Sequence, residues 1–223
     1  MAITKQKLSH NQPRAFQPEK LSKPRGFAIP SALKDVSVHG QPLILEIGAG
    51  KGKHALLFAD QHPHQQMIAI ERTRNKFEAF AKEMQAQALN NLTAVHADAI
   101  AWIVQAVVPN SIAKIYLLYP NPEQHNPNQQ WLNMPFFEFL LSRLQTGGEI
   151  ILATNIEKYI DNAEQKAKAL WCLPTIRQPV APDSRRTHFE IKYLARKEKC
   201  WQITMTKPEG YQTRFDEWHV KLS

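Results

Sequence analysis

The chain has 223 residues, 43% of them hydrophobic and 22% charged, which is the length and composition of a globular protein with one large, well-filled domain. No apolar run approaches the length of a membrane span and no signal peptide is visible, so the sequence predicts a cytoplasmic protein with no membrane partner. Two distant cysteines, Cys172 and Cys200, argue against a disulfide framework or a zinc knuckle.

The formal net charge of +8 is concentrated before the first predicted strand. Residues 1–40 hold seven lysine or arginine side chains against two acidic ones. Two interpretations of this stretch remain open: a flexible arm that meets a polyanion such as RNA, or a solvated leader. We therefore expect a basic N-terminal arm over residues 1–40 and one folded domain over residues 41–223.

A glycine turn follows the first predicted strand. The apolar run over 43–47 ends in Gly48, Gly50 and Gly52, and a helical stretch begins directly afterwards. The spacing G-x-G-x-G differs from the G-x-G-x-x-G of dinucleotide-binding proteins. In addition, Glu46 at the strand end would repel a pyrophosphate but suits a ligand with an ammonium or sulfonium group. S-adenosylmethionine is such a ligand, and we expect it as the cofactor.

Further acids close the next two predicted strands. Glu71 follows the strand over 67–70 and lies near the spacing at which nucleoside-binding sheets place an acid for the ribose hydroxyls. Asp98 follows the strand over 92–96, where a carboxylate can accept a hydrogen bond from an adenine amino group. The competing interpretation is that these are solvated carboxylates or helix caps, and Asp98 in particular can cap the helix after it.

Later segments continue the alternation of helix and strand. The hydrophobic spacing predicts helices over 54–60, 76–89, 99–108, 131–144 and 157–170, and strands over 112–119 and 149–154. The pair Gly147-Gly148 is the expected end of the helix before it. Alternating residues over 188–195 and 200–206, separated by a charged tip, predict a hairpin. The expected fold class is α/β: a seven-stranded, Rossmann-like S-adenosylmethionine-dependent methyltransferase fold, with a mostly parallel sheet and a C-terminal antiparallel hairpin.

Six short motifs then occur in one order over roughly residues 40–206. They are Glu46-Ile47-Gly48-Ala49-Gly50, Ile70-Glu71, His96-Ala97-Asp98-Ala99, Tyr119-Pro120-Asn121-Pro122, Ala153-Thr154-Asn155 and Thr187-His188-Phe189-Glu190. In this order and spacing the chain resembles the tRNA (guanine-N7)-methyltransferase family. The resemblance implies S-adenosylmethionine as cofactor and methylation of N7 of a guanine in the variable loop of tRNA.

The resemblance also implies roles for individual residues. Cofactor contacts carry over to the strand-end acids, the glycine turn and neighbouring positions: Glu46, Gly48, Gly50, Glu71, Asp98, Ala99 and Asn121. Arg72 joins this set because a planar guanidinium can stack on adenine, although it can equally face solvent. Asn121 occupies the catalytic position, and the substrate side carries over to His125, Asn155, Thr187 and Glu190. Phe189 is expected in the core.

Departures from the family pattern concern the substrate side. The family has Pro-Asp-Pro-Trp, then a lysine and a basic run, where this chain has Pro120-Asn121-Pro122-Glu123, then His125 and neutral residues. A second family aspartate is Asn155 here. Because guanine N7 carries a lone pair and no proton, its methylation needs no general base. The two amides should nevertheless weaken the reading of guanine, whose N1–H and N2–H₂ donors favour a carboxylate.

Three hypotheses follow. The first is a methyltransferase acting on tRNA, at guanine N7. The second is a divergent methyltransferase with another nucleobase or a small molecule as acceptor, which the two amides favour. The third is a paralogue that binds cofactor and RNA without catalysis. We expect a monomer or homodimer and no metal, because His54, His62 and His64 have no carboxylate or cysteine at ligand spacing.

Overall fold

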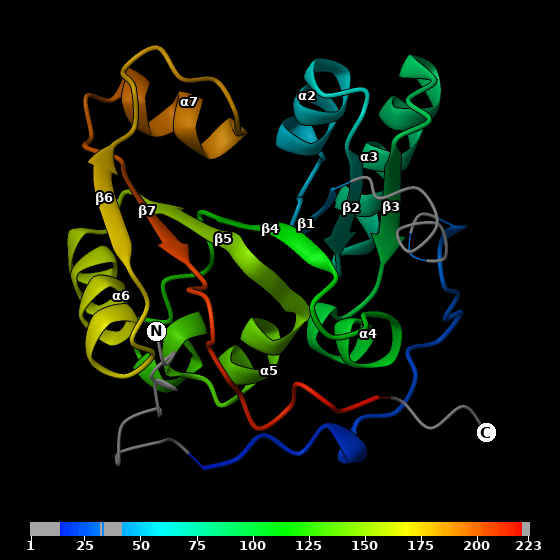
Figure 1. Ribbon diagram of the computed structural model, residues 1–223. Coiled ribbons are helices and arrows are strands. Elements are labelled where there is room, and N and C mark those ends of the chain that lie inside the picture. Colours follow the sequence, from blue (N-terminus) through cyan, green and yellow to red (C-terminus); the bar gives the residue numbers. More distant parts are fainter. Residues whose placement is uncertain (1–13, 32, 34–41, 220–223) are drawn as a thin grey trace.

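A seven-stranded sheet forms the centre of the protein, in a computed structural model that describes residues 14–31, 33 and 42–219. Its strands are β1 (Leu43–Ile47), β2 (Gln66–Glu71), β3 (Leu92–His96), β4 (Ile112–Leu118), β5 (Leu144–Thr154), β6 (Thr175–Pro179) and β7 (Trp201–Thr206). Their order across the sheet is β3-β2-β1-β4-β5-β7-β6 (Figure 1). The first five strands are parallel, whereas β7 is antiparallel to both β5 and β6. The predicted fold class is confirmed.

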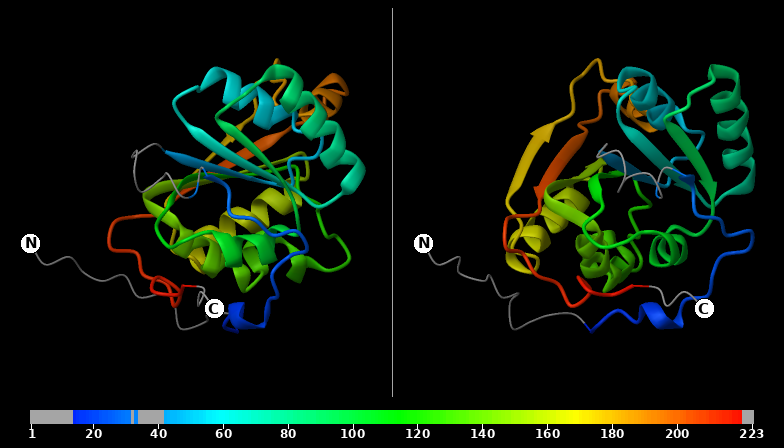
Figure 2. Two further views of the ribbon diagram at one scale, coloured as in Figure 1. Left: turned by 90° about the vertical axis from the view of Figure 1, so that its right-hand side faces the viewer. Right: turned by 45° about the vertical axis from the view of Figure 1, so that its right-hand side comes forward.

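Helices cover both faces of the sheet. They are α2 (Lys53–Gln61), α3 (Arg74–Gln87), α4 (Ala99–Ala106), α5 (Phe136–Arg143), α6 (Glu157–Ala169) and α7 (His188–Ala195), with 3₁₀ turns η1 (Pro18–Lys20), η2 (Pro127–Gln129) and η3 (Trp131–Asn133). In β1, Leu43 and Leu45 pack toward the core with α4, α5 and α6, whereas Ile44 packs toward α2 and α3. Figure 2 shows these two helical layers on opposite sides of the strands. None of the helices in the described ranges is long and apolar enough to cross a membrane.

The prediction of a strand over 188–195 is wrong. This segment is helix α7, and the partner of β7 is instead β6. Thr187 caps the helix, because its Oγ1 accepts a hydrogen bond from the backbone N–H of Glu190 (2.9 Å). The apolar residues on α7 alternate as in a strand, but they are not buried. Phe189, expected in the core, has 46% of its surface exposed.

The prediction of one helix over 131–144 is also wrong in its bounds. A short η3 turn precedes α5, and β5 begins at the residue after α5 ends. Gly147-Gly148 therefore lies inside β5, where the Gly147 N–H donates to the carbonyl of Lys207 (2.8 Å). The strand still ends at Thr154, so Asn155 stays at the strand tip as expected.

Part of the basic N-terminal segment packs on the domain. The ring of Phe16 lies 5.2 Å from that of Phe136 and 6.3 Å from that of Phe215, measured between centroids. The carbonyl of Leu21 accepts a hydrogen bond from Gln105 Nε2 (2.8 Å). Figure 1 shows the blue segment running along the α4 and α5 side of the molecule. Residues 1–13, 32 and 34–41, which hold the rest of the predicted arm, lie outside the described residues.

Candidate cofactor and substrate site

The glycine turn between β1 and α2 leaves open space above its backbone. A Cβ atom built on Gly48 or on Gly50 would meet nothing within 4 Å, although Gly50 has a φ of +61° that other residues rarely adopt. A Cβ atom on Gly52 would instead overlap the ring of Phe80. Two of the glycines thus leave room for a ligand to lie directly on the chain, and the third lets α3 pack against the turn.

Glu71, at the end of β2, holds this turn in place. Its Oε2 accepts a hydrogen bond from the Gly50 N–H (2.8 Å), and its Oε1 accepts one from the Thr73 N–H (2.7 Å). The side chain is 5% exposed. A carboxylate has about four acceptor positions, so Glu71 retains acceptor capacity for two ribose hydroxyls. This arrangement fits a nucleoside placed over the turn.

Glu46 is a buried carboxylate within β1, with 3% of its surface exposed. His54, on the first turn of α2, places Nδ1 3.0 Å from Glu46 Oε2. The ring of Tyr116 lies 4.5 Å from that of His54, and burial raises the pKa of Tyr116 to about 12. A buried carboxylate beside an open turn fits a cationic ligand such as an ammonium or sulfonium group. The sequence pattern around His54 suggests only a metal site, so it does not predict this contact with Glu46.

The remaining predicted cofactor residues lie around the ends of β2 and β3. Asp98 is exposed and caps α4, because its Oδ1 accepts a hydrogen bond from the Ala101 N–H (3.0 Å), and Ala99 is the first residue of that helix. The capping interpretation of Asp98 is therefore confirmed, and its other oxygen can still serve a ligand. Arg72 has an exposed side chain, and its carbonyl lies 3.2 Å from His96 Nε2.

Both amides at the tips of β4 and β5 are hydrogen-bonded to glutamates. Asn121 is exposed, and its Nδ2 donates to Glu123 Oε1 (2.8 Å). Asn155 is half-buried, and its Nδ2 donates to Glu198 Oε2 (2.7 Å). His125 is exposed on the loop between β4 and η2. The segments that follow β4 and β5 begin side by side, because β4 and β5 are neighbouring parallel strands.

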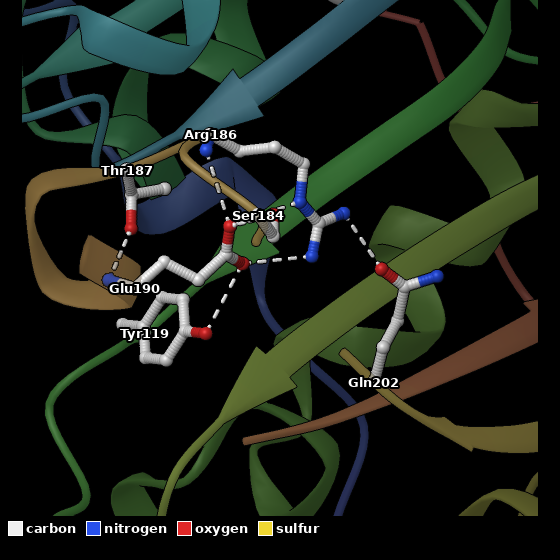
Figure 3. A network of polar contacts seen from close by, with 6 residues as sticks. All are labelled: Tyr119, Ser184, Arg186, Thr187, Glu190 and Gln202. Atoms are coloured by element: carbon white, nitrogen blue, oxygen red, sulfur yellow. Dashed lines mark hydrogen bonds and ion pairs between the residues drawn. The ribbon is translucent and has the colours of Figure 1, made fainter. Parts of the chain in front are cut away.

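Glu190 is the centre of a buried polar network that joins β4, α7 and β7 (Figure 3). Its side chain is 0% exposed. It accepts hydrogen bonds from Tyr119 Oη (3.1 Å), Ser184 Oγ (2.5 Å) and the guanidinium of Arg186 (2.8 Å from Nη2). Arg186 Nη1 also donates to Gln202 Oε1 (2.7 Å). Glu190 therefore faces this network rather than solvent.

The network fixes the protonation of its members. Burial alone would raise the pKa of Glu190, but the hydrogen bonds from Arg186 and Ser184 hold it below its ordinary value. Burial, together with neighbouring Cys200 and Glu190, raises the pKa of Tyr119 far above its ordinary value. Tyr119 is thus a permanent donor and Glu190 a permanent acceptor at neutral pH, and their bond keeps α7 at the end of β4.

One face of α7 is exposed, apolar and surrounded by positive charge; we call it the α7 surface. On this face Phe189 is 46% exposed, whereas Ile191, which is 37% exposed, lies on the other side of the helix because it is two residues further along. The Phe189 ring stacks on that of Tyr193, with centroids 6.0 Å apart and planes at 19°. The surrounding exposed cations are Arg185, Lys192, Arg196, Lys197 and Lys199. Aromatic rings among cations form a surface suited to nucleic acid.

A groove of about 1460 Å³ lies between the loop after β4 and α6. Its wall is rich in amide side chains: Gln124, Asn128, Gln130, Asn133, Asn162 and Gln165. Asn133 Oδ1 is buried, with no hydrogen-bond partner among the described residues. The groove begins beside the β4 tip, so the loop that lacks a basic run still presents a polar surface next to Asn121.

Comparison with known proteins places this geometry in a family. The family model described as "Putative methyltransferase" matches residues 40–203. A tRNA (guanine-N(7)-)-methyltransferase of Nitrosospira multiformis is 27% identical over 215 residues, which is 92% of each chain.

Solved structures share the fold at low identity. The 16S rRNA methyltransferase KamB is 14% identical with a TM-score of 0.63, over 82% of this chain and 96% of that one. Phosphoethanolamine N-methyltransferase 2 of Haemonchus contortus, in complex with S-adenosyl-L-methionine, is also 14% identical, with a TM-score of 0.51, over 82% of this chain and 54% of that one.

Proposed function

The chain belongs to this methyltransferase family, and from that premise we propose that it transfers a methyl group from S-adenosylmethionine to N7 of a guanine in tRNA. The observation that carries the proposal is the open glycine turn, which the bond between the Gly50 N–H and Glu71 holds in place beside the buried carboxylate of Glu46. The relatives named as tRNA (guanine-N(7)-)-methyltransferases supply the acceptor.

The side chains at both ends of the glycine turn fit S-adenosylmethionine. Glu71 has acceptor capacity for the ribose hydroxyls, and Glu46 provides negative charge for the cationic part of the ligand. Asp98 and Arg72, on the exposed side, are suited to the adenine, the first by hydrogen bonding and the second by stacking. Held by these residues, S-adenosylmethionine would supply an electrophilic methyl group to the N7 lone pair, and the electron pair of the carbon–sulfur bond would stay on sulfur in the leaving S-adenosylhomocysteine.

The protein's own residues then have to position and select the guanine. No proton leaves the acceptor nitrogen, so the site requires no general base, and the rate depends on alignment and on the exclusion of water. Asn121, at the β4 tip and held by Glu123, is the residue we place nearest the reacting atoms. Thr187 and Glu190 act through α7: one caps the helix and the other ties it to Tyr119.

Binding of tRNA is assigned to the α7 surface and to the positive charge of the chain. Five exposed cations around α7 and a net charge of +8 favour a polyanion through the release of its counterions. These cations lie on a different segment from the basic run of the family, which is replaced here by neutral residues after the β4 tip. The expected consequence is tRNA binding that weakens steeply with salt.

The test is transfer of labelled methyl from S-adenosylmethionine to bulk tRNA, with the modified base identified by digestion and mass spectrometry. We expect 7-methylguanosine as the labelled nucleoside. Label on another base would overturn the assignment of guanine N7. If no label is incorporated at saturating enzyme although calorimetry confirms cofactor binding, we would conclude that the protein binds cofactor without catalysing methyl transfer.

A further inference from the structure

Each of the two amides at the strand tips donates a hydrogen bond to the carboxylate of a glutamate at another position in the chain. Asn121 holds Glu123 two residues further along the same loop, in a contact open to solvent. Asn155 holds Glu198, which is 43 residues away and enters from the segment between α7 and β7. The second pair is half-buried and formed by tertiary structure, so its carboxylate is the better fixed of the two.

Several contacts fix Glu198 at the end of β5. Its backbone N–H donates to the carbonyl of Tyr193 (3.0 Å), the residue whose ring stacks on Phe189. Lys197, just before it, has a φ of +59°, an uncommon conformation for a residue with a side chain. Asn155 Nδ2 binds Oε2, and among the described residues no hydrogen bond uses Oε1. Glu198 thus offers acceptor capacity at the strand tip next to Asn121.

We propose that Glu198 is the carboxylate that reads the N1–H and N2–H₂ edge of the acceptor guanine, with Asn155 as the residue that positions it. This inference rests on the proposed function. Two parallel donors on a base match the two oxygens of one carboxylate, whereas the amide of Asn155 offers one oxygen. Asn155 donates a hydrogen bond from its N–H₂ group to Glu198. The tip of β5, which carries no charge of its own, therefore presents the Glu198 carboxylate.

The same contact favours the reaction itself. When N7 takes a methyl group, the positive charge of the sulfonium passes to the purine ring. The N1–H becomes more acidic, and its hydrogen bond to a carboxylate becomes stronger in the transition state than in the ground state. Glu198 is therefore expected to contribute to kcat as well as to guanine recognition.

The first experiment compares wild type with Glu198→Gln, on a tRNA transcript that wild type methylates. Glutamine keeps an oxygen for Asn155 Nδ2, so the loop keeps its support while the charge is lost. We expect kcat/KM to fall on the order of 10- to 100-fold, the range for losing a hydrogen bond to a charged group. Affinity for S-adenosylhomocysteine, measured by calorimetry, should stay within about two-fold.

A second measurement reads recognition without catalysis. The transcript is made with guanosine or with inosine, which lacks the N2 amino group, at the methylated position. Fluorescence anisotropy then gives the affinity of each protein for each RNA, with no cofactor present. Wild type should prefer guanosine, and Glu198→Gln should lose most of that preference.

Two further variants provide the controls. Asn155→Asp places a second carboxylate against Glu198 and should lower activity, whereas the double variant N155D/E198Q returns one carboxylate to the strand tip and should regain activity over E198Q. Glu149→Gln makes the same chemical change in the middle of β5, in the ion pair with Lys114, and should behave as wild type.

The outcomes separate this inference from the proposed function. If wild type places no methyl on guanine in tRNA, the proposed function fails and the inference fails with it. If wild type methylates guanine and Glu198→Gln matches it in both rate and guanosine preference, the inference alone is overturned. The same holds if Glu123→Gln, rather than Glu198→Gln, removes the preference.

Discussion

The backbone N–H of Gly50 donates a 2.8 Å hydrogen bond to Oε2 of Glu71, across 21 residues of sequence. One carboxylate thereby fixes the glycine turn and stands at the end of β2, where we propose that the ribose binds. Both the shape and the charge of the proposed cofactor site thus depend on the Glu71 side chain. Substitutions that break this hydrogen bond should reduce cofactor affinity more than they reduce the stability of the fold.

Glu71→Ala is the direct test of this dependence. It removes the acceptors for the Gly50 and Thr73 N–H groups and the proposed acceptors for the ribose. Losing hydrogen bonds to a charged group costs about 1.5–3 kcal/mol each, so affinity for S-adenosylhomocysteine in calorimetry should fall at least ten-fold. Glu78→Ala, on the exposed side of α3, is the matched control. Unchanged affinity in Glu71→Ala would remove Glu71 from the cofactor site.

The glycines separate binding from folding. Gly50→Ala fills open space at a φ of +61°, so we expect a loss of about 1 kcal/mol in the free energy of unfolding and a large loss of cofactor affinity. Gly52→Ala sets a methyl group into the Phe80 ring and should reduce the free energy of unfolding by several kcal/mol. Urea denaturation and calorimetry measure the two effects. Equal destabilisation by both variants would contradict this division of roles.

Local patterns predict the strand, the glycine turn and the helix at the proposed cofactor site, because each of these elements follows from one short stretch of sequence. Glu71 and the glycines were predicted for the cofactor from the strand–turn–helix spacing alone, and the turn that they form confirms the local structure. Contacts between distant segments could not be predicted in the same way. The bond between Asn155 and Glu198 is of this kind. It depends on β7 returning beside β5, a relationship that no short-range spacing encodes.

The misassignment of α7 has a specific physical origin. Phe189, Ile191 and Tyr193 occur at every second position, which is the period of a strand. The opposing signal was the Thr187-x-x-Glu190 pattern of a helix start. Burial settles the question, because Glu190 is 0% exposed while Phe189 projects outward. In this segment the polar residue is internal and the aromatic residue is available to a partner.

The buried network around Glu190 should make stability depend on pH. Glu190→Gln leaves Arg186 without its anion, so the free energy of unfolding at pH 7 should fall on the order of 3 kcal/mol. Because the pKa of Glu190 lies below its ordinary 4.5, the wild-type advantage is complete above that value and is lost as pH falls through the lowered pKa. Urea denaturation at pH 7 and under strongly acidic conditions measures it. A difference that stays constant with pH would show that Glu190 is not ionised in the folded protein.

Phe189→Ala tests whether the α7 surface meets RNA. A ring that is 46% exposed and supported by Tyr193 can stack on a base, and such stacking contributes about 1–3 kcal/mol per base. We expect the affinity for tRNA, measured by anisotropy at a fixed salt concentration, to fall about 5- to 100-fold, while thermal stability changes little. Ile176→Ala removes a more exposed apolar residue from β6 and should leave the affinity unchanged. If the two variants bind tRNA equally well, the exposed ring serves another partner. A loss in Phe189→Ala alone would mean that the residue expected in the core is instead a contact with the substrate, because α7 is a helix and turns it toward solvent.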